Sequence, residues 1–379
     1  MTASDRTSVP TLEDALIREI QVLLPGMSAE FEDTEGALFW KTLSAKHIAL
    51  LHQYGFENFK RTINFEYSQW GVTSFLDSRI RRLLGGLLRR GRIPWGGLFA
   101  RYDLSDRLVR WPDGIDLKTG EAIVATDAST NAKTDMKSTS RFRAHALYCG
   151  LLWQRALASD HLDILKRVEE PRLGNPLPIC YHGRLISQDL ALGCLELNRI
   201  DRHHPLSRVR RVLEIGAGYG RLAWLFRTLY PDIEYSIVDI PPAVALSRRY
   251  LEGVFGPSEV AVDFWGRSSG KPEGLSTAPV KLYTPDALDR FPDGHFDLIL
   301  NISSFDEMDP ATVTRYFRAI DRLGAGALYL KGYGRARSAG RLGLESFPQG
   351  AGWMTAYLGE DPVIPGFVET VWTRIGTRG

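Results

Sequence analysis

The sequence has little cysteine, no long apolar run and almost no net charge, and each absence excludes a class of protein. Its 379 residues include three cysteines, Cys149, Cys180 and Cys194, with no CxxC or Cys/His pair among them. This excludes a disulfide framework or zinc site and predicts reduced thiols in a cytoplasmic protein. No apolar run could span a bilayer, and the first residues lack the apolar core of a signal peptide. The net charge of +2 argues against a nucleic-acid binder.

The pattern of the sequence changes near the middle of the chain. Helical periodicity dominates the first half, which includes an Arg-rich stretch at 78–92 and a polar, turn-rich stretch at 112–140. From residue 208, short β-branched runs alternate with helical stretches, which is typical of a doubly wound α/β sheet. We therefore predict a mainly helical region at 1–200. Its expected role is to cover the acceptor or to mediate oligomerisation, for example as a homodimer. A Rossmann-like α/β domain follows at 201–379.

The Arg-rich stretch at 78–92 has Leu and Ile at helical spacing, which predicts a solvated amphipathic helix. A docking face for an acidic partner or a membrane surface is the alternative. The stretch at 112–140 is expected to form an excursion that acts as a lid.

The motif VLEIGAGYGR, at 212–221, places glycines at alternate positions directly after a predicted strand. Such a turn lets a ligand approach the backbone at the carboxyl edge of a sheet. A dinucleotide site would need GxGxxG, but Arg221 stands at the third glycine position. S-adenosylmethionine (SAM) has no phosphate and suits the observed spacing better. Glu214 would hold its cationic amino-acid end, often through water, and the glycines would make room for its methionyl and ribose parts.

Later strands bring further polar residues to the same edge. Asp239 ends the next apolar strand, where a carboxylate can accept both ribose hydroxyls. Asp286 follows another strand and could accept the adenine amino group, with a turn acid as the alternative. The predicted strand HFDLILN, at 295–301, delivers polar residues from Asn301 onward. The predicted cofactor-binding residues are Glu214, Gly216, Ala217, Gly218, Gly220, Asp239, Ile240, Asp286, Asn301 and Ser303.

These motifs resemble those of a known enzyme family. VLEIGAGYGRLA, YSIVDIPPAVALSRRYL and LNISSFDEM are similar to class I SAM-dependent methyltransferases, and more narrowly to a family of sugar O-methyltransferases from polysaccharide and natural-product gene clusters. FWKTL, ENFKR and GNPLPICYHGRLISQD resemble that family's amino-terminal elements. The resemblance implies a class I methyltransferase sheet, SAM as cofactor and S-adenosylhomocysteine as product. It implies methyl transfer to a hydroxyl of a sugar or of a glycosylated natural product.

A hydroxyl acceptor needs a general base near the methyl group. Glu307 and Asp306 are the best placed candidates, with an acid paired to an arginine as the alternative for Glu307. Asp306 departs from the family, in which an amide-bearing or similar residue is expected there. His182 is a third candidate, with a hydrogen-bonded loop histidine as its alternative. No compact ligand cluster accompanies these acids, so we predict a metal-independent enzyme.

Other residues are weaker candidates for the cofactor pocket and for the acceptor side of the site. Asp189 and Arg184 are candidates for the cofactor pocket. Trp353 and Tyr357, between the last predicted strands, are expected on the acceptor side, whereas aromatics such as Phe59 are expected in the core.

Two further functions remain open on the sequence alone. The acceptor could be a carboxylate or hydroxyl on a peptide or polyketide, and a carboxylate would need no base. The chain could also be a non-catalytic SAM-binding partner protein. An NAD-dependent oxidoreductase is disfavoured by Arg221 and by the lack of a second nucleotide-binding half.

Overall fold

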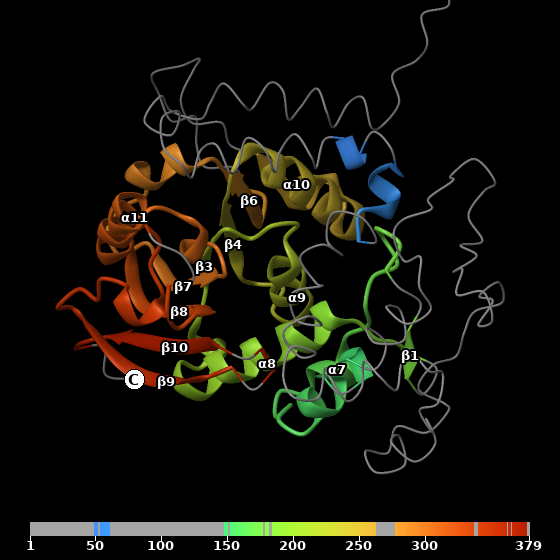
Figure 1. Cartoon of the computed structure of the whole chain (residues 1–379). Helices are drawn as coiled ribbons and strands as arrows, with labels where there is room; N and C mark the ends of the chain where they lie inside the picture. The colour runs from blue at the N-terminus through green and yellow to red at the C-terminus, as the bar shows by residue number, and fades with distance from the viewer. Residues whose placement is uncertain are drawn as a thin grey trace, which may run out of the picture.

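The computed structural model describes the second half of the chain almost continuously and the first half in short segments. The described residues are 49–51, 54–60, 148–150, 152–176, 179–181, 184–262, 277–336, 340–361, 363–364 and 366–376. They form an eight-stranded mixed sheet with helices on both faces, and a separate two-stranded ribbon (Figure 1). The predicted lid and the Arg-rich stretch lie outside the described residues.

The elements alternate in the order expected of an α/β domain. The helices are α7 (Ile164–Arg167), α8 (Gln188–His203), α9 (Arg221–Leu229), α10 (Pro241–Phe255) and α11 (Pro310–Leu323). The strands of the large sheet are β3 (Arg211–Ile215), β4 (Glu234–Val238), β5 (Val260–Val262), β6 (Val280–Tyr283), β7 (Phe296–Ile302), β8 (Gly324–Tyr333), β9 (Trp353–Glu360) and β10 (Phe367–Arg374). The ribbon pairs β1 (Cys180–Tyr181) with β2 (Arg184–Leu185). Short 3-10 helices are η3 (Phe56–Asn58), η4 (Leu206–Arg208), η5 (Pro257–Glu259), η6 (Pro285–Arg290), η7 (Phe305–Glu307) and η8 (Leu344–Ser346).

The strand order identifies the fold class. It runs β5-β6-β4-β3-β7-β8-β10-β9. The strands from β5 to β8 are parallel, whereas β10 is antiparallel to both of its neighbours. The chain first adds strands on one side of β3, the first strand of this sheet, and then on its other side, and the antiparallel strand β10 is inserted near the far edge. This arrangement is the Rossmann-like class I methyltransferase sheet. The predicted fold class is therefore confirmed.

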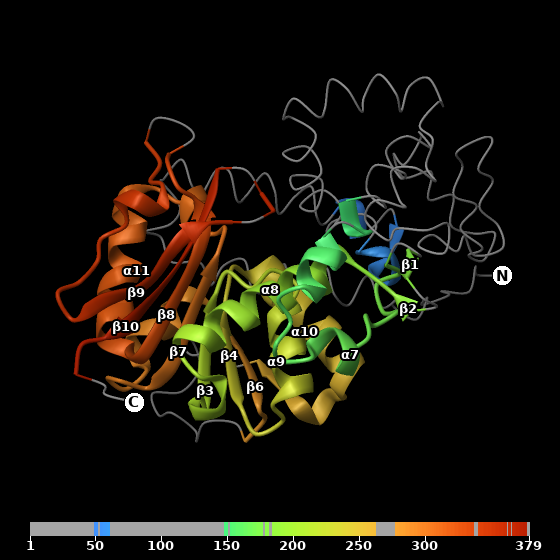
Figure 2. The same ribbon diagram turned by 90° about the horizontal axis from the view of Figure 1, so that it is seen from below.

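The central strands are apolar because both of their faces are covered. In β3, Val212 contributes to a core beneath α8, α9 and α10, while Leu213 and Ile215 contribute to a second core beneath α11. Figure 2 shows these helices on opposite sides of the sheet. Phe59 is fully buried in the first core, as predicted. This core also includes described residues before 201, and the domain boundary at residue 200 stays a prediction.

Helix α8 lies across the first core with its amino terminus at the carboxyl edge of the sheet. Its N-cap is Ser187, because the Ser187 hydroxyl accepts from the Leu190 N–H at 3.0 Å. The other end of α8 leads through η4 into the start of β3, so the helix runs opposite to that strand. The first turn of α8 is thereby brought toward the loops that follow the parallel strands.

None of the helices in the described part of the chain is both long enough and apolar enough to cross a membrane.

Candidate functional site

Three glycines follow β3, and all three have left-handed backbone conformations. The φ angles are 79° at Gly216, 61° at Gly218 and 85° at Gly220, a region that other residues seldom adopt. A Cβ at Gly216 would lie 2.4 Å from the Ser304 side chain, whereas no heavy atom of the described residues lies within 4 Å of a Cβ at Gly218. The loop therefore needs glycine for its conformation, and no described side chain fills the space beside the Gly218 backbone.

The Asp239 side chain lies against this glycine loop, just after β4. Its Oδ2 accepts from the Gly218 N–H at 2.8 Å, and its Oδ1 accepts from the Ile240 N–H at 2.7 Å. Burial raises the pKa of Asp239 to about 7, although the N–H groups of Gly218, Ile240 and Ala217 lower it. The carboxyl is thus fixed at the loop and titrates near neutral pH.

The Glu214 side chain is enclosed between β3 and the helices. It is only 4% exposed, and its Oε2 accepts from the Tyr235 hydroxyl at 2.7 Å. Burial raises the pKa of Glu214 to about 7, although Tyr235 and Arg221 lower it. Its predicted role at the amino-acid end of the cofactor stays a prediction.

Asn301 and Ser303 hold the carboxyl ends of three strands together. The Asn301 side chain is buried; its Nδ2 donates to the Ile215 carbonyl at 2.8 Å and its Oδ1 accepts from the Phe305 N–H at 3.3 Å. Ser303 has a φ of 54°, and its N–H donates to the Lys331 carbonyl at 2.7 Å. Both residues therefore shape the edge on which a ligand would rest.

Asp306 and Glu307 lie in η7, at the same edge as the glycine loop. Asp306 Oδ2 accepts from the Tyr333 N–H at 3.3 Å. Burial raises the pKa of Glu307 to about 8; Asp306 and Asp239 also raise it, whereas Arg341 lowers it. The Arg341 guanidinium donates to the backbone carbonyl of Glu307. Glu307 is therefore a carboxyl of raised pKa near Asp239, with its predicted role as a base still to be tested.

The remaining predicted site residues are spread more widely. Asp286 is exposed on η6, directly after β6, and so lies at the same edge of the sheet. His182 lies outside the described residues. Arg184 donates to the carbonyls of Leu165 and Val168, which fixes the chain around α7 and gives no sign of a role in the cofactor pocket.

The prediction that Trp353 lies on the acceptor side is wrong. Residues 353–360 are not a covering insertion but the edge strand β9. Trp353 pairs with Arg374, and its ring contacts Gly324 at the start of β8, so it lies at the opposite edge from the glycine loop. The Tyr357 ring packs against the Arg199 guanidinium, 4.1 Å from the ring centroid, within the interface between β9 and α8.

The amino terminus of α8 is joined to the glycine loop through one side chain. Tyr219 stands between Gly218 and Gly220 in the sequence, and its hydroxyl donates to Asp189 Oδ2 at 2.7 Å. Burial and Asp189 raise the pKa of Tyr219 well above its ordinary value, so the hydroxyl keeps its proton. Arg221 Nη1 donates to the backbone carbonyl of Asp189 at 3.2 Å.

Segments from the first half of the chain support the same loop. Lys60 forms a buried ion pair with Glu170 and lies over the rings of Tyr219 and Tyr250, 5.4 Å and 4.9 Å from their centroids. The Phe59 ring contacts the Tyr219 ring at a centroid distance of 5.2 Å. The ENFKR motif therefore contributes to the packing of the glycine loop.

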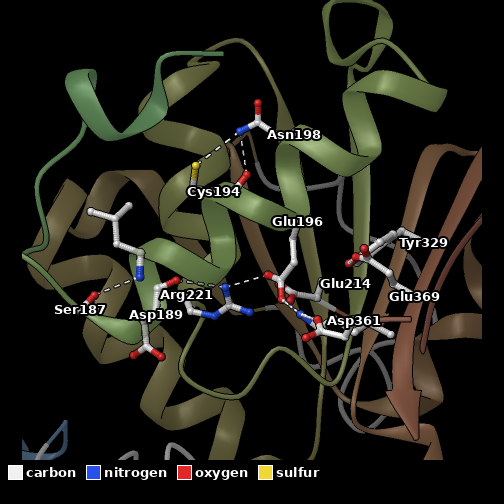
Figure 3. A network of polar contacts seen from close by, with 12 residues as sticks. Ser187, Asp189, Cys194, Glu196, Asn198, Glu214, Arg221, Tyr329, Asp361 and Glu369 are labelled. Atoms are coloured by element: carbon white, nitrogen blue, oxygen red, sulfur yellow. Dashed lines mark hydrogen bonds and ion pairs between the residues drawn. The ribbon is translucent and has the colours of Figure 1, made fainter. Parts of the chain in front are cut away.

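Sequence reasoning missed a buried charge network behind the site (Figure 3). Glu196 of α8 accepts from Arg221 at 2.8 Å and pairs with Lys331 at 3.2 Å, and Lys331 also pairs with Asp361 at 2.6 Å. Burial lowers the pKa of Lys331, but Asp361 and Glu196 outweigh this effect and raise it above its ordinary value. Two signals were available: a lysine within an apolar strand and a glutamate on the apolar face of a helix.

The carboxyl edge of β3, β4 and β7 thus combines an open glycine loop with two carboxyls of raised pKa. Such an edge can bind a ligand through backbone contacts and carboxylate acceptors, and can take up a proton. Within the described residues, no group of three or more His, Cys, Asp or Glu side chains is arranged to hold a metal ion.

No protein-family model and no curated protein matches this chain. Solved structures that it resembles include the pyocyanin biosynthetic protein PhzM, at 15% identity and a TM-score of 0.35, over 49% of this chain and 57% of PhzM, which is less than two thirds of that protein. The mitomycin 7-O-methyltransferase MmcR matches at 14% identity and a TM-score of 0.34, over 62% of this chain and 71% of MmcR. Magnesium protoporphyrin IX methyltransferase ChlM from Synechocystis PCC 6803 matches at 12% identity and a TM-score of 0.35, over 50% of this chain and 83% of ChlM. The fold assignment rests on the strand order.

Proposed function

We propose that this protein is a SAM-dependent O-methyltransferase whose acceptor is a hydroxyl of a sugar or of a glycosylated natural product. The observation that supports it most is the left-handed glycine loop after β3, fixed to Asp239 by the 2.8 Å hydrogen bond from Gly218. In a class I methyltransferase sheet, this is the position of the cofactor. The sugar acceptor rests on the sequence resemblance alone.

The residues at this edge fit SAM better than a dinucleotide. The space beside Gly218, which no described side chain fills, would let a ligand come into close contact with the backbone. Asp239 would accept the ribose hydroxyls, and the exposed Asp286 would accept the adenine amino group. Arg221 occupies the third glycine position of a dinucleotide motif, and its side chain leads away to Glu196.

When bound, SAM supplies an electrophilic methyl group next to a positive sulfur. The chain must hold the acceptor oxygen in line with that methyl group and exclude water. Glu307 would take the proton of the acceptor hydroxyl as the bond from oxygen to the methyl carbon forms and the bond from that carbon to sulfur breaks, which leaves S-adenosylhomocysteine. Asp306 and His182 are the other candidates for this base. A base with a pKa of about 8 is well matched to proton transfer near neutral pH.

The first test is calorimetric binding of SAM, S-adenosylhomocysteine and NAD to the wild-type chain and to Asp239→Ala. We expect the wild-type chain to bind the two adenosyl ligands but not NAD, and the variant to lose that binding. Tight NAD binding, or no binding of any of the three, would contradict the proposal.

The acceptor class is tested with SAM carrying a labelled methyl group and a panel of acceptors. Sugars and glycosides form methyl ethers, which withstand mild alkali, whereas methyl esters of peptide or polyketide carboxylates release labelled methanol. Alkali-stable label on a sugar supports the proposal. Alkali-labile label identifies a carboxylate acceptor, and SAM binding without transfer to any acceptor supports a non-catalytic partner protein.

A further inference from the structure

A SAM-dependent enzyme must bind the ammonium group at the amino-acid end of its cofactor, and the structure bears on which carboxylate does so. Glu214 is the second-to-last residue of β3, and only 4% of its surface is exposed. Its carboxyl lies on the α8 side of the sheet, where Tyr235 donates to it at 2.7 Å. Burial favours its neutral form. These features suit a core residue better than a ligand of a cation.

Asp189 offers a second carboxylate near the same loop. It lies in the first turn of α8, which begins at the carboxyl edge of the sheet. The side chain is half-buried, and its Oδ2 accepts from Tyr219, the residue between the second and third glycines of the loop. Figure 3 shows the carboxylate pointing away from Arg221 and Glu196, whereas the backbone carbonyl of Asp189 accepts from Arg221.

The surroundings of Asp189 fix its position. Ser187, two residues earlier, caps α8 and donates to Glu170 Oε2 at 2.5 Å. Glu170 is itself paired with Lys60, whose ammonium lies over the Tyr219 ring. The start of α8 and the tyrosine of the glycine loop are thus held by the same ion pair. A carboxylate fixed in this way is preorganised to bind a cation.

We propose that Asp189 binds the α-ammonium group of SAM, and that Tyr219 orients the Asp189 carboxylate through its hydrogen bond to Oδ2. This inference rests on the proposed function and names the ligand of one part of its cofactor. A charge-assisted hydrogen bond from an ammonium to a carboxylate is stronger than one between neutral groups. The aspartate of the ISQD segment would therefore act in cofactor binding.

The test compares ligands with and without the amino-acid end. Calorimetry measures the affinities of S-adenosylhomocysteine and methylthioadenosine, which lacks that end, for the wild-type chain and Asp189→Asn. We expect the variant to bind S-adenosylhomocysteine at least about tenfold more weakly and methylthioadenosine within about twofold of wild type. Retained methylthioadenosine binding also shows that the variant folds. Tyr219→Phe should cause a smaller loss with the same ligand selectivity.

The matched control is Asp201→Asn, on the last turn of the same helix, where the side chain accepts from His161 and the Leu206 N–H. It should leave both affinities unchanged. Equal weakening of both ligands by Asp189→Asn, or no weakening, would overturn the inference while leaving the proposed function intact. A selective loss in Glu214→Gln instead would assign the ammonium to Glu214. If the wild-type chain binds neither ligand, the proposed function fails, and this inference with it.

Discussion

The backbone N–H of Gly218 donates to Oδ2 of Asp239 across 2.8 Å, which joins the loop after β3 to the end of β4. Because burial raises the pKa of Asp239 to about 7, this carboxyl is only partly ionised at neutral pH. The ionised form accepts hydrogen bonds from ribose hydroxyls better than the neutral form does. Cofactor binding should therefore depend on pH.

We expect the affinity for S-adenosylhomocysteine to rise about tenfold between about pH 6 and about pH 8, and to level off above that range. Below pH 7 the carboxyl must release a proton when the ligand binds, which weakens binding. Calorimetry of wild type and Asp239→Asn checks this, since the variant should bind weakly at every pH. Asp232→Asn, an exposed acid at the opposite edge, is the control. A flat wild-type profile would show that Asp239 does not titrate on binding.

The loop glycines should differ in their tolerance of alanine. Gly216→Ala must adopt a φ of 79° and place a Cβ 2.4 Å from Ser304, whereas Gly218→Ala meets no described atom within 4 Å. We expect a loss in free energy of unfolding of about 1–2 kcal/mol for Gly218→Ala, from its conformation alone. Gly216→Ala should lose about 1–3 kcal/mol more, from the clash. Urea unfolding measures both.

The clash at Gly216 has its own control. Adding Ser304→Gly to Gly216→Ala removes the side chain that a Cβ would meet. The double variant should recover the part of the loss that exceeds that of Gly218→Ala. If it recovers nothing, the cost at Gly216 comes from its backbone conformation and not from packing.

Glu214 should make the unliganded protein less stable as pH rises. Its pKa is raised to about 7 in the folded chain, chiefly by burial, so the unfolded chain releases this proton first. Stability from this group is complete below about pH 4.5 and is lost as pH rises through about 7. Between about pH 5 and pH 7, we expect the wild type to lose about 2 kcal/mol more in free energy of unfolding than Glu214→Gln. Parallel unfolding curves for the two proteins would contradict this.

Glu307→Gln should lower kcat by about 100-fold to 10,000-fold if this residue is the base for a hydroxyl acceptor. The wild-type rate should rise with pH up to about 8, the pKa to which burial raises the Glu307 carboxyl, and then level off. Steady-state kinetics across pH measures both effects. Glu345→Gln, a partner of Arg335 outside the site, serves as control. A full rate in Glu307→Gln would exclude Glu307 as the base and leave Asp306, His182 or a carboxylate acceptor that needs no base.

Two lysine ion pairs of the same length should differ greatly in their contribution to stability. Lys331 lies 2.6 Å from Asp361 in the buried network, and Lys166 lies 2.6 Å from Asp163 on the surface. Lys331→Met leaves buried carboxylates without their cation and should cost about 3–5 kcal/mol in free energy of unfolding. Lys166→Met, at an exposed and solvent-screened pair, should leave the free energy of unfolding almost unchanged. Similar losses in urea unfolding would mean that the buried lysine is less enclosed than the structure indicates.

The local features of the sequence predicted much of this domain. The apolar strand at 212–215 and the three glycines after it are encoded within a few neighbouring residues, so periodicity and turn chemistry were sufficient to place them. The edge strand β9 was not predictable in this way, because it forms by pairing with β10, which follows later in the chain. For that reason Trp353 was expected in a segment that covers the acceptor side and not in a strand.

The polar contacts across the fold also lay beyond local patterns. Glu196 and Lys331 are 135 residues apart, and Tyr219 and Asp189 are 30 apart. A charged residue in an apolar stretch indicates a buried partner but does not identify it. The sequence was thus sufficient to place Glu214 in the strand β3 and Asp239 directly after β4. It did not show which of the two carboxyl groups is enclosed by the core.

The charge network has a consequence for synthesis of the chain on the ribosome. Glu196 emerges 135 residues before its partner Lys331, an interval of about 10 s at common elongation rates. During that time Arg221, 25 residues after Glu196, can pair with the Glu196 carboxylate, but Lys331 and its second partner Asp361 have yet to be synthesised. We therefore expect the buried network to be completed only when the carboxy-terminal strands arrive.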